Sequence, residues 1–223
     1  MNVVFGASGF AKEVESALYL SARYVDVRWS GIQYFVVKDF SHLESRMIHG
    51  VPVILESDFF NNRQDKYDNI YIGIGNPKTK ESIVTMIESQ DKKSILPRFI
   101  FPNFIHPSVQ YDNRESRIKI VQGNIICAGC ILTTDIELHD FVHINLDCTI
   151  GHDVAIGDYS TLAPGVHVSG NVAIGKRVYI GTGAVIREKI KICDDAVIGA
   201  GAVVVKDIME PGIYIGVPAI RMK

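Results

Sequence analysis

A histidine followed directly by an aspartate, His152–Asp153 in the stretch IGHDVAIG, is the combination in this sequence best suited to acid–base chemistry. A neutral imidazole can remove a proton from an attacking amine or hydroxyl near pH 7, and a carboxylate beside it can fix its tautomer and raise its basicity. A histidine at a turn is most often only solvated, which is how we interpret His139 and His167. Adjacency in sequence does not prove that the side chains of His152 and Asp153 touch, so their contact is a hypothesis.

A second candidate site is the glycine turn GASGF, from Gly6 to Phe10, between a short apolar stretch and a helical one. In α/β proteins such a turn presents backbone N–H groups and a helix N-terminus to a phosphate. The turn lacks the complete G-x-G-x-x-G pattern, and a tight turn without a ligand is the alternative. A nucleotide site is favoured by Asp39 at the end of the second strand, where acidic side chains commonly bind a ribose or base. The segment after the fourth strand adds candidates that we expect at the same sheet edge: Gly75, Asn76 and Lys80.

The elements that position this turn alternate between strand and helix patterns. Apolar Phe10, Val14 and Leu18, at i, i+4 and i+8, predict a helix over residues 10–22, and a second helix is predicted over residues 78–90. Strands are predicted at residues 1–5, 32–39, 51–55 and 69–76. This alternation predicts a Rossmann-like α/β domain with a small parallel sheet over residues 1–95. Residues 96–119 contain three prolines and no period, which is typical of a domain junction.

Residues 120–209 carry a different pattern, with an aliphatic residue at every sixth position. From Ile120 to Val204, fifteen consecutive positions of this period are Ile, Leu or Val. The fifth place of each hexad is small or β-branched, with Asn124 as the exception. This period fits neither a helix nor an ordinary strand and predicts a parallel β-helix of hexapeptide repeats, in which short strands stack on one another. Residues 210–223 are predicted to form a C-terminal tail.

The composition argues against several classes of protein. Basic and acidic residues nearly balance, 23 against 25, which gives no indication of nucleic-acid binding. No apolar run approaches the roughly 18 residues of a membrane helix, and the N-terminus lacks a signal-peptide pattern, so we expect a soluble, cytoplasmic protein. Cys127 and Cys130 form a C-x-x-C, the pattern of half a zinc site or of a redox pair. Because Cys130 and Cys148 both take the fifth place of their hexads, three hexads apart, we interpret them as stacked core residues and expect no metal.

Three stretches together resemble the PglD/NeuD-like acetyltransferases, which acetylate nucleotide-linked amino sugars or sialic acid: GASGFAKEV, INLDCTIGHDVAIGDYSTLAPGVHVSGNVAIG and GVPAIRMK. The resemblance covers nearly the whole chain. It implies that three hexads form one left-handed coil, hence about five coils, and that residues 1–95 bind a nucleotide sugar. It further implies acetyl-CoA as cosubstrate and a homotrimer with active sites between neighbouring chains.

The resemblance also implies roles for individual residues. His152 would be the general base toward the sugar amine, with Asp153 beside it, and Asn145 matches an active-site asparagine. The backbone N–H of Gly170 would face the acetyl carbonyl as an oxyanion donor. The matching positions of the first domain would hold the nucleotide: Gly6, Ser8, Gly9, Phe10 and Asp39. Acetyl-CoA would contact a further set in the β-helix and tail: Thr161, Gly170, Thr182, Ala200, Lys206 and Arg221.

Three positions depart from the family's pattern. Thr161 stands in place of a second histidine, Gly151 in place of an acidic residue before the base, and Phe10 in place of a histidine. The implied reaction is N-acetylation of a nucleotide-linked amino sugar of the 4-amino-4,6-dideoxyhexose type, in surface polysaccharide or glycan biosynthesis. It would need no metal and no covalent intermediate, and the sequence leaves the nucleotide and the sugar open.

Three alternative functions are considered beside this one. One is an O-acetyltransferase acting on sialic acid, another sugar or another small hydroxyl acceptor such as serine, although the first domain argues against serine because a free amino acid needs no nucleotide site. A γ-class carbonic anhydrase has the same β-helix with three histidine ligands, but the spacing of His139, His143 and His152 does not match that family. A non-enzymatic scaffold would not need Asn145, His152 and Gly170 together, and micromolar binding of acetyl-CoA would distinguish it from an enzyme.

Overall fold

The computed structural model describes residues 1–22, 31–61, 68–91, 99–112, 114 and 117–222. The chain divides into two compact units, Met1–Gly75 with Thr79–Pro102, and Asn76–Lys78 with Asn103–Lys223. Within the described ranges, no helix has the length and apolar character needed to cross a membrane.

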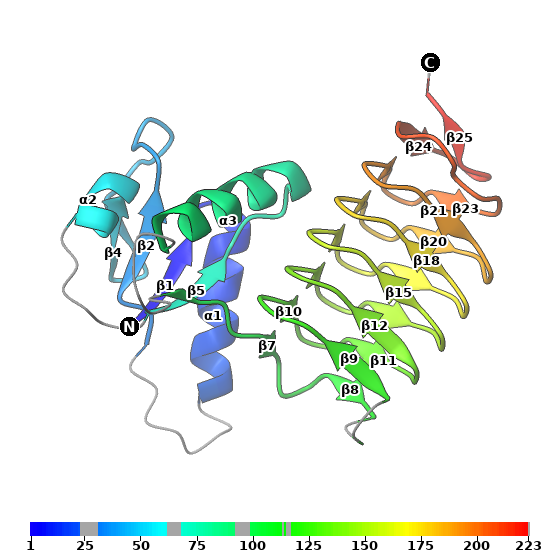
Figure 1. The fold of residues 1–223 in the computed structure, drawn as a ribbon, viewed down its shortest axis with the longest axis horizontal. Coiled ribbons are helices and arrows are strands. Elements are labelled where there is room, and N and C mark those ends of the chain that lie inside the picture. The colour runs from blue at the N-terminus through cyan, green and yellow to red at the C-terminus, as the bar shows by residue number, and fades with distance from the viewer. Residues whose placement is uncertain (23–30, 62–67, 92–98, 113, 115–116, 223) are drawn as a thin grey trace. The chain divides into compact units, whose positions relative to one another are not determined.

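The first unit contains a six-stranded sheet in the order β3-β4-β2-β1-β5-β6. Figure 1 labels β1, β2, β4 and β5 of this sheet. β1 lies inside this sheet, pairs in parallel with β2 and β5, and is buried along its whole length. β3 runs antiparallel to β4, and the other pairs are parallel. The strands are β1 (Asn2–Phe5), β2 (Tyr34–Val37), β3 (Met47–Ile48), β4 (Val51–Leu55), β5 (Asp68–Ile72) and β6 (Phe99–Ile100), and the helices are α1 (Gly9–Ala22), α2 (Glu56–Asn61) and α3 (Pro77–Asp91).

The alternation of strands and helices expected from the sequence is confirmed in this unit. The four expected strands correspond to β1, β2, β4 and β5, and the two expected helices to α1 and α3. The sequence did not indicate β3, α2 or β6. Two-residue strands and a six-residue helix are too short to show a period, because a period needs several repeats to be visible.

The second unit is a parallel β-helix whose short strands form three sheets, which we call faces I, II and III. Each strand pairs with the strand three hexads further along, so the chain visits the faces in turn and rises by one strand per coil. Face I contains β7 (Phe104–Ile105), β10 (Ile125–Ile126), β13 (His143–Ile144), β16 (Thr161–Leu162), β19 (Tyr179–Ile180), β22 (Val197–Ile198) and β24 (Ile213–Ile215), with β25 (Ile220–Arg221) antiparallel to β24.

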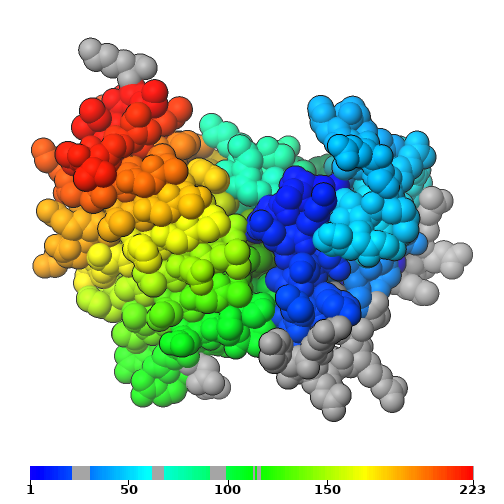
Figure 2. All heavy atoms as spheres, turned by 180° about the vertical axis from the view of Figure 1, so that it is seen from behind, coloured from blue at the N-terminus to red at the C-terminus, as the bar shows by residue number. Residues whose placement is uncertain are grey.

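Faces II and III complete each coil. Face II contains β8 (Gln110–Tyr111), β11 (Ile131–Leu132), β14 (Thr149–Ile150), β17 (His167–Val168), β20 (Val185–Ile186) and β23 (Val203–Val204). Face III contains β9 (Ile118–Ile120), β12 (Ile136–Leu138), β15 (Ala155–Ile156), β18 (Ala173–Ile174) and β21 (Lys191–Ile192). Figure 2 shows the successive coils as stacked bands whose colour runs from green to red.

The β-helix extends beyond residues 120–209 at both ends. β7, β8 and β9 lie in residues 96–119 or reach just past them, and β24 and β25 lie in the segment expected to be a tail. β9 ends at Ile120, where the hexad pattern begins. β7 and β8 escape the pattern because the pairs Ile105–Ile126 and Tyr111–Leu132 are three residues further apart than the pairs of the regular coils, and β24 escapes it because the pair Ile198–Tyr214 is two residues closer. The hexad period therefore marks the regular middle of the β-helix rather than its ends.

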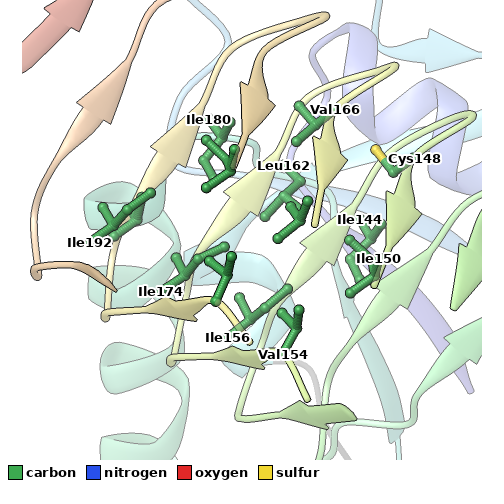
Figure 3. Close-up of a cluster of buried hydrophobic side chains, with 14 of the residues drawn as sticks. Ile144, Cys148, Ile150, Val154, Ile156, Leu162, Val166, Ile174, Ile180 and Ile192 are labelled. Carbon is green, nitrogen blue, oxygen red and sulfur yellow. The ribbon is translucent and has the colours of Figure 1, made fainter. Parts of the chain in front are cut away.

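The core of the β-helix is formed by the aliphatic residue of each hexad, which points inward from every face. Figure 3 shows Ile144, Ile150 and Ile156 of one coil beside Leu162 and Ile174 of the next. These side chains are buried, and each stacks on the equivalent side chain of the neighbouring coil. The hexad pattern therefore arises from a continuous column of stacked apolar side chains.

The fifth place of the hexad also points inward. Cys130 and Cys148 are fully buried there, and their Sγ atoms donate to the carbonyl oxygens of Asn145 (3.0 Å) and Ala163 (3.3 Å). This confirms the interpretation of both as core residues. Asn124, the polar exception, is buried and accepts from the N–H of Val142 through its side-chain oxygen (2.9 Å).

Candidate functional site

The glycine turn of the first unit lies at the carboxyl edge of the sheet. Gly6 follows β1 and donates its N–H to Val36 of β2 (2.9 Å), and Gly73 after β5 donates to Phe5 (2.9 Å). Gly6 has φ +113°, and a Cβ there would lie 2.9 Å from the carbonyl oxygen of Gly73. The turn therefore requires glycine, both for its left-handed backbone and for the close approach of β5.

Other expected residues of this edge follow from the strand order. Asp39 comes two residues after β2 and Gly75 three residues after β5, so both lie at the same carboxyl edge as Gly6. α1 begins at Gly9, and a helix N-terminus can offer its first N–H groups to an anion. Among the remaining candidates, Ser8 and Asn76 are exposed and Phe10 is half-buried.

Two of the candidate site residues of this unit have shifted pKa values. The Ser41 hydroxyl and the Ser41 backbone N–H both donate to the exposed carboxylate of Asp39, which lowers the pKa of Asp39. Asp39 is therefore held as an anion at the sheet edge. Lys80, in the first turns of α3, is fully buried, and desolvation lowers its pKa well below the usual range of a lysine. Its ammonium is therefore less accessible to a ligand than the sequence suggested.

The turns that connect face II to face III, which we call corner II–III, carry the acid–base pair. Nδ1 of His152 lies 2.7 Å from Oδ2 of Asp153, and both side chains are more than half exposed. Asp153 has φ +58°, a left-handed conformation that Asp tolerates better than most residues. Because a carboxylate accepts but does not donate, Nδ1 is the donor in this contact, and in the neutral ring Nε2 is then the acceptor. The expected contact between the two side chains is present in the structure.

Gly170 and Lys206 belong to the same corner. They follow β17 and β23 at the place that His152 occupies after β14. The turns of His152 and Gly170 are joined by a hydrogen bond from the N–H of Asn171 to the carbonyl oxygen of His152 (2.8 Å). Gly170 is buried, whereas Lys206 is exposed.

The other candidates for the acetyl-transfer site lie elsewhere on the β-helix. Asn145 follows β13 and accepts from the N–H of Leu146 through its side-chain oxygen (2.8 Å), in the turns between faces I and II, which we call corner I–II. Thr182 and Ala200 lie at that same corner and are exposed. Thr161 is buried on face I, and Arg221 of β25 forms an ion pair with Glu210 (2.6 Å). Apart from Thr161 and Arg221, the candidate residues are thus divided between two corners, at the two edges of face II.

A hollow of about 350 Å³ on face III adjoins corner II–III and was not expected from the sequence. Asp153 lines it together with two ion pairs between successive coils, Arg117–Asp135 (3.1 Å) and Lys119–Glu137 (2.5 Å). In both pairs the partners lie one coil apart. Once the length of a coil is known, a search of the sequence for opposite charges one coil apart finds both ion pairs.

The three histidines considered as metal ligands lie in different places. His143 is buried on face I, while His139 is exposed and lies 3.8 Å from Asp158. His152 stands at corner II–III with Asp153. Within the part of the chain that the structure describes, no three His, Cys, Asp or Glu side chains form a metal-binding group.

Two protein-family descriptions match parts of this chain. Residues 3–87 match the PglD N-terminal domain, and residues 171–206 match the bacterial transferase hexapeptide (six repeats). The expected fold, an α/β Rossmann-like domain followed by a left-handed parallel β-helix of hexapeptide repeats, is confirmed. A comparison with curated proteins found no match.

Solved structures similar to this chain include three that align over nearly its whole length. PerB from Caulobacter crescentus, in complex with CoA and GDP-perosamine, has a TM-score of 0.85 at 25% identity and covers 100% of this chain and 97% of its own. The acetyltransferase domain of PglB from Neisseria gonorrhoeae FA1090, in complex with acetyl coenzyme A, has a TM-score of 0.81 at 26% identity and covers 99% and 98%. WeeI from Acinetobacter baumannii AYE has a TM-score of 0.79 at 28% identity and covers 100% and 99%.

Proposed function

We propose that this chain, a member of the PglD/NeuD-like sugar acetyltransferases by both of its domains, transfers acetyl from acetyl-CoA to the amine of a nucleotide-linked amino sugar. The observation that carries the proposal is the His152–Asp153 pair at 2.7 Å, in a β-helix similar to those of proteins solved with acetyl-CoA or CoA. The expected acceptor is an amino sugar of the 4-amino-4,6-dideoxyhexose type, as GDP-perosamine is for PerB. The enzyme would act in the cytoplasm, in polysaccharide or glycan biosynthesis.

The chemical step follows from the hydrogen bond between His152 and Asp153. The sugar amine attacks the thioester carbonyl, and Nε2 of His152 takes a proton from the amine as the C–N bond forms. The C–S bond then breaks, and the same proton passes from Nε2 to the leaving sulfur, so that CoA leaves as a thiol. Asp153 holds the ring in the required tautomer and stabilises the imidazolium formed in between. No metal is needed.

The remaining roles at corner II–III concern the acetyl group. The tetrahedral intermediate places negative charge on the former carbonyl oxygen, and a backbone N–H aimed at that oxygen stabilises it. Gly170 supplies the candidate N–H, because it lies in the turn directly bonded to that of His152. Lys206, exposed at the same corner, would attract the phosphates of acetyl-CoA.

The first unit would bind the nucleotide at its carboxyl edge. The turn from Gly6 to Gly9 opens the N-terminus of α1 toward a phosphate, with Ser8 exposed beside it. Asp39, ionised and at the same edge, would accept hydrogen bonds from a ribose or a base. Lys80 is buried, so we assign it a structural role within this site rather than direct contact with the ligand.

We also propose that the enzyme is a homotrimer in which face II is the contact surface. The residues that point outward from face II carry no permanent charge: Gln110, Ile131, Thr149, His167, Val185 and Val203. Face III, by contrast, presents Lys119, Glu137 and Lys191. If face II of three chains meets around one axis, corner II–III of one chain comes beside corner I–II of its neighbour. This would bring His152 near Asn145, Thr182 and Ala200 of the neighbouring chain.

The first test is an assay of CoA thiol release with a panel of nucleotide-linked 4-amino-6-deoxy sugars and CMP-sialic acid as acceptors. We expect turnover of one amino sugar, and a loss of kcat of at least about 10²-fold in His152→Ala. His139→Ala is the matched control, because His139 is a similarly exposed histidine at another turn. Turnover that is unchanged in His152→Ala, or absent with every acceptor, would contradict the proposal.

The trimer is tested with Val185→Glu on face II. A buried carboxylate at the contact surface is costly, so we expect a monomer by light scattering and turnover below detection. Ala173→Glu, at the outward place of β18 on face III, is the matched control and should stay trimeric. A Val185→Glu trimer with full activity would rule out face II as the contact.

A further inference from the structure

Corner II–III repeats one turn in successive coils, and among the described turns after β11, β14, β17, β20 and β23 only one has glycine at its second residue. The second residues, two positions after the end of each of these five strands, are Thr134, His152, Gly170, Glu188 and Lys206. The third residue of the turn takes the left-handed conformation, as at Asp153 and Asn171. Gly170 itself has no left-handed φ, so its backbone would accept a side chain as it does in the other coils.

The space that a side chain at Gly170 would occupy is filled by the imidazole of His152. A Cβ on Gly170 would lie 2.5 Å from Nε2, 2.7 Å from Cε1 and 2.9 Å from Cδ2 of His152. Gly170 is buried although it stands at a corner, while the His152 side chain is 59% exposed. The imidazole therefore lies against the bare Cα of Gly170.

We infer that Gly170 is a positioning residue, whose missing side chain lets the His152 imidazole keep the orientation in which Nδ1 donates to Asp153. All three ring atoms nearest to a Cβ at Gly170 belong to the edge of the imidazole that includes Nε2. A side chain there would push the ring away and break the 2.7 Å contact with Asp153. The consequence for catalysis rests on the proposed function, but the effect on the ring does not.

Gly170→Ala separates this positioning role from two other roles that Gly170 could have, as an oxyanion donor through its backbone N–H and as a residue that the fold requires. Alanine keeps the backbone N–H, so an oxyanion donor would be preserved. The backbone conformation suits alanine, and the atoms it would displace belong to an exposed ring rather than to the core, so the protein should fold. What changes is the orientation of His152.

The direct test uses ¹⁵N-histidine-labelled protein without substrate. In the wild type we expect the His152 ring to be protonated at Nδ1, with Nε2 as acceptor. In Gly170→Ala we expect the two ring-nitrogen resonances to move toward the mixed-tautomer positions of an exposed histidine, as they should in Asp153→Ala. A Gly170→Ala ring spectrum identical to that of the wild type would overturn the inference, whatever the enzyme's activity.

The kinetic test measures the coupling between Gly170 and His152. We expect Gly170→Ala to lower kcat by about 10- to 10²-fold, the effect of a misplaced catalytic group, with KM for acetyl-CoA changed less than about threefold. In a His152→Ala background the same substitution should have no further effect. Two results would show that Gly170 acts on acetyl-CoA instead. One is a rise in KM for acetyl-CoA with kcat unchanged, and the other is a loss of kcat that is as large in the His152→Ala background as in the wild type.

Stability is controlled with Gly199→Ala, another β-helix glycine without a left-handed φ, whose Cβ would meet the exposed side chain of Ile215 at 2.7 Å. Both alanine variants should keep a melting temperature within a few degrees of the wild type. Absence of turnover in the wild type would count against the proposed function alone, because the ring spectrum still decides the orientation of His152.

Discussion

At the carboxyl edge of the first unit the candidate phosphate ligands are backbone N–H groups of a turn, whereas at corner II–III of the β-helix the candidate acid–base groups are side chains placed on a repeated turn. Gly6 is needed where it stands because its backbone is left-handed and β5 passes close by. Gly170 is not needed by its own backbone, and the side chain that occupies the place of its missing Cβ is that of His152 in the coil before. Glycine thus permits a tight backbone turn in the first unit and leaves room for a neighbouring side chain in the β-helix.

The difference shows what a repeat contributes to a site. In the β-helix each turn has an equivalent in the neighbouring coil, so a residue that departs from its column stands out against the others. His152 and Gly170 are such departures at corner II–III. The sheet edge of the first unit has no internal equivalents, and its function can be inferred only from the order of its strands.

Among substitutions that should affect one of the two sites and leave the other unchanged, we expect the largest effect from Asp153→Asn. An amide that donates to Nδ1 would favour the tautomer with the proton on Nε2, which cannot accept a proton from the amine. We expect kcat to fall about 10²-fold or more, with binding of the nucleotide sugar to the first unit unchanged. Steady-state kinetics with each substrate varied, and calorimetric binding of the nucleotide, provide the two measurements.

Asp135→Asn is the matched control for this substitution. Asp135 occupies the same place of the turn one coil earlier, also with a left-handed backbone (φ +55°), but its partner is Arg117 rather than a histidine. The kcat of Asp135→Asn should stay within about twofold of that of the wild type. Equal losses in the two variants would mean that the carboxylates act on the β-helix and not on His152.

The next effect concerns the first unit and is expected from Gly6→Ala. The φ of +113° is strained for any residue with a Cβ, and the new methyl group would lie 2.9 Å from a backbone oxygen. We expect a loss of about 1–3 kcal/mol in the free energy of unfolding, measured in urea, and weaker binding of the nucleotide sugar. kcat at saturating acceptor should change little, since corner II–III is untouched.

Gly9→Ala provides the comparison for stability. A Cβ at Gly9 meets nothing within 4 Å, and the residue begins α1, so alanine should leave the free energy of unfolding unchanged or raise it slightly. If Gly6→Ala were as stable as Gly9→Ala, the turn would be more adaptable than its geometry indicates.

The fold was predictable to the extent that it is periodic. Inward residues such as Ile144 and Ile150 repeat, and the repeat gave the β-helix and the buried cysteines. The two-residue strand β6 and the short helix α2 carry no period and were missed. In the same way β8 went unnoticed, because Tyr111 and its partner Leu132 are three residues further apart than the pairs of the regular coils, which places Tyr111 outside the hexad frame.

The candidate site was predictable only in part. The contact between His152 and Asp153 follows from the turn that joins them, so the pair could be named from the sequence. The burial of Lys80 could not, because an amphipathic helix pattern does not show how deep one lysine lies. Nor could the contact between Gly170 and the His152 ring, which depends on how two turns of neighbouring coils stack in detail.

The smallest expected effect is a difference in salt dependence between two carboxylates, one from each unit, whose pKa values are both lowered. At Asp39 the pKa is lowered by hydrogen bonds from Ser41, a neutral residue. At Asp195 it is lowered by hydrogen bonds from the Arg177 guanidinium one coil earlier, through Nε (3.0 Å) and Nη2 (2.9 Å).

Salt should distinguish these two causes. It screens the attraction of a charged partner much more than a hydrogen bond from a neutral one. In ¹³C titrations of the side-chain carboxyl groups at 0.05 M and 1 M NaCl, we expect the pKa of Asp195 to rise toward its ordinary value at high salt and that of Asp39 to move less. The Arg177–Asp195 pair should then contribute about 0.2–1 kcal/mol to stability above the unfolded pKa of about 3.9, and this contribution should disappear as the pH falls through the lower folded pKa. Asp195→Asn should remove that pH dependence, and equal salt shifts for Asp39 and Asp195 would mean that the two regions hold their carboxylates in the same way.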